Sequence, residues 1–248
     1  HMDTFMSLTD VFPVDPVSFF VPLKQHLAPG KSDYGEQWRQ LDHLTHERQT
    51  VFLKTCPYSD LKAFSLILGM LPDDSCLHLS NSTPVRYTQL FKYPTPLIFM
   101  SNRGTSGIDG VVSTAAGFAF ISSKINTVIT GDLAFFYDSN ALWIRHLAPN
   151  LRIIVINNQG GGIFRIIDGP SSMPALKSHF EARHDMSAEP VARAFYLDCF
   201  VASTEGELRQ GLQWLYNSTF QKPAVLEVKT PADVNAGILT QYFNYLRG

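Results

Sequence analysis

From residue 59 to the end of the chain, short apolar runs alternate with segments of helical spacing or with glycine-rich stretches. Continuous runs of this length are typical of strands buried on both faces, and their alternation with helices predicts a covered parallel sheet. We therefore expect an α/β fold: a predominantly parallel six-stranded sheet with helices on both faces. The predicted strands are Leu77–Leu79, Leu97–Met100, Val128–Thr130, Ile153–Ile156, Cys199–Ala202 and Val225–Val228.

Two helices stand out between these runs. Ser59 and Asp60 provide a capping sequence for an apolar helix over Leu61–Leu71, which a proline and two aspartates close. A second helix is predicted from Asp132 to about Leu147, directly after the third strand. Helices in these places are consistent with strand–helix–strand units.

The first 58 residues have a different pattern. Residues 1 to 32 contain several prolines and end in Pro29-Gly30, which predicts a loosely structured lead-in. A polar stretch from Tyr34 to Lys54 has its few apolar residues at roughly helical spacing and predicts a linking helix. We expect residues 1–58 to comprise a tag remnant (His1-Met2), the tail of a preceding domain and this linker, and residues 59–248 to form one domain.

Composition excludes several classes of function. The 248 residues are 45% hydrophobic and 17% charged, and the net charge of −2 gives no basic surface for nucleic acid. No apolar run approaches the roughly 18 residues that a membrane span needs. Three scattered cysteines are too few for a disulfide framework or a zinc cluster, so we expect a cytoplasmic protein.

Polar residues follow two of the predicted strands. Asp132 comes directly after the third strand and Asn158 after the fourth, 26 positions later, so both should lie at one edge of the sheet. Carboxylate, amide and carbonyl oxygens are the ligands that Mg²⁺ prefers beside a phosphate. Taken alone, Asp132 could be only a helix cap, and the Asn157–Gly162 stretch could be only a flexible turn.

The Gly-Asp pair and the Asn-Asn pair at this spacing resemble the diphosphate–metal motif of thiamine-diphosphate enzymes. The resemblance implies that Asp132, Asn158 and the backbone carbonyl of Gly160 hold Mg²⁺, or Mn²⁺ in its place, against the cofactor diphosphate. Residues 59–248 would then be the diphosphate-binding domain. Leu133 stands where many members have a second glycine, a departure found in one branch of the superfamily.

Two further strings also follow strands. The string Ser101–Gly110 places Arg103 at a strand end, where a guanidinium can bind a carboxylate through two hydrogen bonds, although a surface arginine on a tightly packed segment is the plainer interpretation. The string Ser80–Arg86 adds a hydroxyl and an arginine, and alone it indicates only a turn.

Together the strings resemble the 2-succinyl-5-enolpyruvyl-6-hydroxy-3-cyclohexene-1-carboxylate synthases (MenD) of the same superfamily. The resemblance implies that substrate contacts come from Ser82, Arg86 and Arg103. It also implies that the cofactor is held by residues from three segments, namely Gly107 and Ile108, Asp132 and Leu133, and Asn158, Gly160, Ile163 and Phe164.

A histidine-containing string, His179–His184, could suggest a metal site. Its spacing suits no common helical zinc motif, and we favour a mobile loop over the active site, spanning about residues 165–190. The sequence contains no nucleophile elbow, Walker loop or dinucleotide fingerprint.

The resemblance also implies an activity. Thiamine diphosphate and Mg²⁺ would serve decarboxylation of 2-oxoglutarate and addition of the four-carbon unit to isochorismate, in menaquinone biosynthesis. The activating glutamate would come from a pyrimidine-binding domain outside this sequence, so we expect the chain alone to be inactive and its parent to be a homodimer or homotetramer. The face that meets this domain should then be unusually apolar and exposed, which predicts self-association or partial disorder around residues 104–120 and 160–190. Alternatives are another thiamine-diphosphate lyase, of the acetolactate synthase or 2-oxoacid decarboxylase type, and a non-catalytic scaffold of the same fold.

Overall fold

The computed structural model describes residues 3–28, 30–93 and 96–248. The contacts divide the chain into two compact units, His1–His46 and Glu47–Gly248, which are described separately. The tag remnant expected at His1-Met2 and the turn residue Pro29 lie outside the described residues. The domain boundary expected after residue 58 stays a prediction.

The first unit contains a helix where we expected a loosely structured lead-in. α1 (Pro16–His26) begins after Asp15, whose carboxylate accepts the N–H of Ser18 at 3.0 Å, and has proline at its first position. These are ordinary helix-start signals, so interpreting the prolines only as breakers was wrong here. α2 (Tyr34–Thr55) begins in this unit and confirms the predicted helix.

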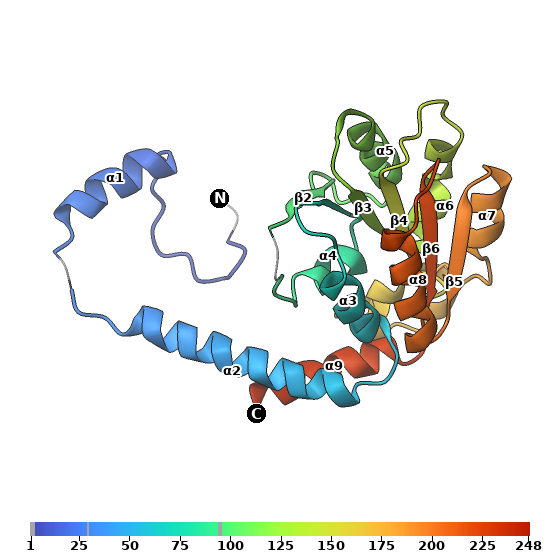
Figure 1. Cartoon of the computed structure of the whole chain (residues 1–248). Helices are drawn as coiled ribbons and strands as arrows, with labels where there is room; N and C mark the ends of the chain where they lie inside the picture. The colour runs from blue at the N-terminus through green and yellow to red at the C-terminus, as the bar shows by residue number, and fades with distance from the viewer. Residues whose placement is uncertain (1–2, 29, 94–95) are drawn as a thin grey trace. The chain divides into compact units, whose positions relative to one another are not determined.

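The second unit is built on a six-stranded sheet in which every pairing is parallel, with strand order β2-β1-β3-β4-β6-β5 (Figure 1). This confirms the predicted fold class. Each observed strand overlaps its predicted run and differs from it by at most a few residues at either end. The strands are β1 (Cys76–Leu79), β2 (Ile98–Ser101), β3 (Asn126–Gly131), β4 (Leu151–Asn157), β5 (Asp198–Ala202) and β6 (Ala224–Lys229).

Seven helices accompany the sheet, in addition to the end of α2, among the residues that the structure describes. α3 begins after a Ser59 cap, as predicted, and ends two residues before the expected Leu71. The helices are α3 (Asp60–Gly69), α4 (Thr83–Thr88), α5 (Val111–Ile121), α6 (Asp132–Tyr137), α7 (Ala188–Ala194), α8 (Glu205–Asn217) and α9 (Asn235–Arg247). No helix within the described ranges is long and apolar enough to cross a membrane.

Two apolar cores lie on the two faces of the sheet. Successive strand residues point to opposite faces, so Ile154 and Ile156 of β4 join the core under α3, α4, α8 and α9. Ile153 and Val155 join the second core, under α5, α6 and α7 (Figure 1). Residues 151–157 are all buried, which explains why the sequence shows continuous apolar runs and not alternation.

The helix after β3 is much shorter than predicted. α6 ends at Tyr137, and a short 3-10 turn over Ser139–Leu142 replaces the helix expected to about Leu147. The buried Asp138 carboxylate accepts the backbone N–H of Ser113 at 2.8 Å and its hydroxyl at 3.2 Å. A side chain committed to the start of α5 turns the chain at this point, and Asp-Ser-Asn is a weak helix former.

Candidate functional site

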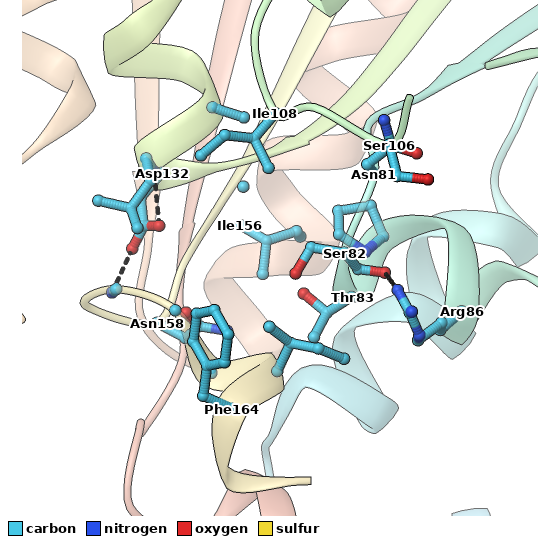
Figure 2. A pocket seen from close by; sticks show the side chains of 18 of the residues that line it. Asn81, Ser82, Thr83, Arg86, Ser106, Ile108, Asp132, Ile156, Asn158 and Phe164 are labelled. Carbon is cyan, nitrogen blue, oxygen red and sulfur yellow. Dashed lines mark hydrogen bonds between the residues drawn. The ribbon is translucent and has the colours of Figure 1, made fainter. Parts of the chain in front are cut away.

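Four parallel strands deliver polar residues to one edge of the sheet. Because β1 to β4 run in the same direction, the segments after their carboxyl ends lie next to one another and enclose a cavity of about 310 Å³. Figure 2 shows side chains from these segments facing a common space. The sequence-predicted residues that line the cavity are Ser82, Arg86, Arg103, Ile108, Asp132, Leu133, Asn158, Gly160, Ile163 and Phe164.

Asp132 is the buried carboxylate of this cavity, with 2% of its surface exposed. Its two oxygens accept backbone N–H groups, Oδ1 from Leu133 at 2.7 Å and Oδ2 from Gly160 at 2.9 Å (Figure 2). Burial raises the pKa of Asp132, while these backbone hydrogen bonds and the nearby His184 oppose that rise. The hydrogen bond to Gly160 joins the end of β3 to the loop after β4.

The loop after β4 depends on glycine. Gly160 has a φ of +131°, and a Cβ at this position would overlap the carbonyl oxygen of Glu181. Gly161 donates its N–H to that same oxygen at 2.6 Å. The Gly160 carbonyl accepts the N–H of Gly162 at 2.9 Å and keeps a second lone pair.

Asn158 is fixed by a carboxylate from a distant segment. Its Nδ2 donates to Oδ2 of Asp60 at 2.8 Å, and both side chains are buried. Asp60 also accepts the hydroxyl of Thr230, while its own backbone N–H donates to Oδ1 of Asn235 at 2.9 Å. Burial raises the pKa of Asp60 to about 6, against the lowering effect of the Thr230 and Asn158 hydrogen bonds.

His184 lies beside Asp132. Its Nδ1 accepts the backbone N–H of Met186 at 3.0 Å, so the neutral ring carries its proton on Nε2. Nε2 lies 3.3 Å from Oδ2 of Asp132, yet this buried nitrogen does not meet the geometry of a hydrogen bond. Among the described residues, this buried nitrogen beside the Asp132 carboxylate therefore has no hydrogen-bond partner.

Ser82 and Arg86 come from the segment after β1. Ser82 precedes α4 with φ +75° and ψ −131°, a backbone conformation that disfavours residues with a Cβ. The exposed Arg86 donates to the Ser82 carbonyl at 2.8 Å, as Figure 2 also shows. The pair presents a hydroxyl and a guanidinium at one wall of the cavity.

Arg103 is positioned by Asn81. Its guanidinium donates to Oδ1 of the buried Asn81 at 2.7 Å, and Nδ2 of Asn81 donates to the carbonyls of Asn102, at 2.7 Å, and Gly107. Gly107, which the resemblance implies to contact the cofactor, is not among the residues that line the cavity. Instead, its carbonyl helps to hold the loop that carries Arg103.

The remaining wall is apolar. Ile163 and Phe164 come from the turn after Gly162, while Ile108 and Leu133 come from the segments after β2 and β3. A Cβ at Gly161 would meet the Phe164 ring at 2.9 Å, so the absence of a side chain there allows the ring its position. The cavity therefore combines a polar edge with an apolar side.

The segment expected to form a lid begins at the end of the short helix Gly162–Arg165 and contains the short helix Pro170–Ser172 and a π-helical turn, Leu176–Phe180. Within it, buried Glu181 pairs with Arg165, which also contacts Asp233 at 2.8 Å. These contacts tie the start of the segment to Glu181 within it and to Asp233 outside it. Its motion over the cavity stays a prediction.

The donor set at the polar edge fits a hard divalent cation. The Asp132 carboxylate, the Asn158 amide and the Gly160 carbonyl all border the same cavity, and each offers oxygen. Across the described residues there is no group of three or more His, Cys, Asp or Glu placed for a metal, so such a cation would rely on this mixed set. Two arginines, Arg86 and Arg103, also line the cavity and suit anionic ligands.

Sequence reasoning assigned no site role to Asp60, Asn81 or His184. Asp60 is 98 positions from Asn158, and a helix-capping sequence accounted for it completely. His184 was included in the predicted loop, although nothing in the local sequence indicates that it reaches Asp132. Asn81 lies within the string Ser80–Arg86, which directly follows a strand, and this position could have indicated a role at the site.

Comparisons with known proteins identify relatives of the chain. No family model matches the chain. It is 41% identical to the 2-succinyl-5-enolpyruvyl-6-hydroxy-3-cyclohexene-1-carboxylate synthase of Flavobacterium johnsoniae over 244 residues, which is 98% of the chain and 44% of that protein. It is 43% identical to the same synthase of Christiangramia forsetii, over 81% of the chain and 34% of that protein.

A similar fold occurs in the crystal structure of benzoylformate decarboxylase from Polynucleobacter necessarius. The TM-score is 0.62 at 16% identity, over 72% of the chain and 34% of that protein, which establishes a shared fold. The chain spans less than half the length of the curated relatives it matches. By its identity of 40–43% to such relatives over 81–98% of its own length, the chain belongs to the family of 2-succinyl-5-enolpyruvyl-6-hydroxy-3-cyclohexene-1-carboxylate synthases.

Proposed function

We propose that this chain is the diphosphate- and metal-binding part of a thiamine-diphosphate-dependent synthase that acts on 2-oxoglutarate and isochorismate in menaquinone biosynthesis. The observation that carries the proposal is one cavity whose lining combines Asp132, Asn158 and Gly160 at a polar edge with two arginines, Arg86 and Arg103. The family relationship supports the choice of synthase over another lyase or a scaffold.

In this proposal the oxygens of Asp132, Asn158 and Gly160 hold Mg²⁺, or Mn²⁺ in its place, beside the cofactor diphosphate. Ile108, Leu133, Ile163 and Phe164 exclude water from the apolar side of the cavity. When bound, thiamine diphosphate supplies the chemistry for decarboxylating a 2-oxo acid and forming a carbon–carbon bond. The protein residues anchor and orient the reactants.

The two arginines suit the substrates. Both proposed substrates are dianions, and a guanidinium can orient a carboxylate through paired hydrogen bonds. Arg103 is held by Asn81 and Arg86 by the Ser82 carbonyl, so each is partly ordered before a ligand arrives. Ordering in advance lowers the entropic cost of binding.

Catalysis in this proposal requires more than the present sequence. The activating glutamate comes from a pyrimidine-binding domain, and the complete enzyme is a homodimer or homotetramer. The chain alone is then inactive, while it retains the determinants for diphosphate and metal.

Calorimetric titration of thiamine diphosphate into the chain tests the proposal. We expect heat of binding with Mg²⁺ present, no heat with EDTA, and no heat for Asp132→Ala. Asp198→Ala, which removes a carboxylate from the start of edge strand β5, serves as the matched control and should bind normally. Metal-independent binding, or unchanged binding by Asp132→Ala, would contradict the assigned ligands.

A further inference from the structure

A buried carboxylate outside the cavity lining contacts one of the proposed metal ligands. Asp60 is 1% exposed and lies at the first turn of α3, yet it is not needed as the helix cap, because the Ser59 hydroxyl accepts the N–H of Lys62 at 3.4 Å. The Asp60 side chain points instead to Asn158 and Thr230. Its position therefore requires an explanation other than helix capping.

The contact determines which way the Asn158 amide faces. An ionised carboxylate only accepts hydrogen bonds, so the nitrogen of the Asn158 amide must face Oδ2 of Asp60, at 2.8 Å. The oxygen of the Asn158 amide therefore faces away from Asp60. A divalent cation binds that oxygen and is repelled by an N–H group.

Asp60 is itself held from two further segments, by its carboxylate and by its backbone. Thr230, directly after β6, donates its hydroxyl to Oδ1, and Asn235, at the start of α9, accepts the Asp60 backbone N–H at 2.9 Å. All four side chains are buried. In a buried network, a single pattern of donors and acceptors is strongly preferred because a buried donor or acceptor that is left unpaired is costly.

We propose that Asp60 is a positioning residue that sets the orientation of the Asn158 amide, so that its oxygen and not its nitrogen is offered to the metal. This rests on the proposed function of the cavity. Outer partners of this kind typically change metal affinity by about 10–100-fold when they are removed. Asp60 would act only through Asn158 and would touch neither metal nor substrate.

Amide hydrogen exchange of the Asn158 side chain, followed by NMR on the metal-free chain, tests the orientation itself. The Nδ2 protons should exchange at least about tenfold more slowly than those of exposed Asn140. Asp60→Leu should abolish this protection. Asp60→Asn, which keeps an acceptor oxygen at the same position, should retain it. Thr230→Val removes another donor to the same carboxylate and should leave the protection in place.

Mn²⁺ binding with thiamine diphosphate, followed by electron paramagnetic resonance, tests the consequence. Asp60→Leu should weaken Mn²⁺ binding at least about tenfold, while Thr230→Val stays within about twofold. If Asp60 acts through Asn158, Asp60→Leu should have no further effect in an Asn158→Ala background. Asp60→Ala provides a second variant if the leucine variant does not fold.

Fast exchange of the Asn158 amide in the unmodified chain would overturn the proposal, whatever the variants do. The proposal would also be overturned if Asp60→Leu lowered Mn²⁺ affinity equally in the wild-type chain and in Asn158→Ala. In that case the effects of the two substitutions would simply add, as expected if Asp60 has only a structural role. Failure of the unmodified chain to bind Mn²⁺ with the cofactor would instead overturn the proposed function. In that case the exchange rates would still decide whether Asp60 orients the amide.

Discussion

Individual backbone conformations at the cavity carry strain that the sequence does not reveal. Ser82, with φ +75° and ψ −131°, occupies a region that glycine adopts more readily, at a cost of order 1–3 kcal/mol. The free energy of unfolding of Ser82→Gly should therefore be about 1 kcal/mol higher than that of Ser82→Ala. Both variants lose the hydroxyl, but only glycine relieves the strain. Chemical denaturation of both variants measures this. Equal stabilities would show that the serine conformation is unstrained.

Gly160 should tolerate no side chain. Its φ of +131° and the overlap of a Cβ with the Glu181 carbonyl predict that Gly160→Ala lowers the free energy of unfolding by several kcal/mol. Gly117 provides the matched control, because it lies inside α5 and an added methyl group there would meet no atom within 4 Å. Gly117→Ala should raise stability by up to about 1 kcal/mol. Denaturation curves that show a neutral Gly160→Ala would contradict the close approach in this loop.

The thiols should be unreactive in the folded chain. Burial raises the pKa of Cys56 and Cys76, and it raises the pKa of Cys199 to about 12. An unfolded thiol ionises near pH 8.5, so the stability linked to these thiols is present below that pH and is lost as pH rises toward the folded pKa. Iodoacetamide at about pH 8 should alkylate Cys199 at least about tenfold more slowly in the folded than in the denatured chain, by mass spectrometry. Equal rates would contradict the assigned burial.

At the scale of elements, the parallel strands could be predicted and the helix ends could not. The strands are buried on both faces, so the sequence records them as continuous apolar runs. α6 ends early because the Asp138 side chain bonds to Ser113, 25 positions away, and no local pattern encodes such a contact. α1 could have been recognised from Asp15 and Pro16, since both are local start signals.

The contact between Asp138 and Ser113 gives a test at this scale. Asp138→Ala leaves the Ser113 N–H without its partner and should lower the free energy of unfolding by about 1–3 kcal/mol. Ser113→Ala keeps that N–H bond and loses only the hydroxyl, so its loss should be smaller, about 0.5–1.5 kcal/mol. Denaturation of the two variants gives both values. If Ser113→Ala lowered the free energy of unfolding more than Asp138→Ala does, the main contribution assigned to the Asp138–Ser113 N–H bond would be contradicted.

At the scale of the whole molecule, the topology explains why so much of the candidate site could be predicted. Parallel strands end at one edge, so polar residues directly after strands could be placed together without knowing any side-chain contact. The role of Asp60 could not be predicted, because its partner Asn158 belongs to a distant segment and meets it only through the packing of α3 on the sheet. The sequence therefore predicts which residues line the cavity better than it predicts which residues orient them.

Hydrogen–deuterium exchange of the chain with and without thiamine diphosphate and Mg²⁺ would show whether the cofactor binds where we place it. Binding at the carboxyl edge of the sheet should protect residues 131–134 and 158–164, and leave the opposite ends of the strands, around residues 149–151 and 222–224, unchanged. Asp132→Ala should remove the protection. Protection confined to the opposite edge, or protection that persists without metal, would contradict the placement of the site.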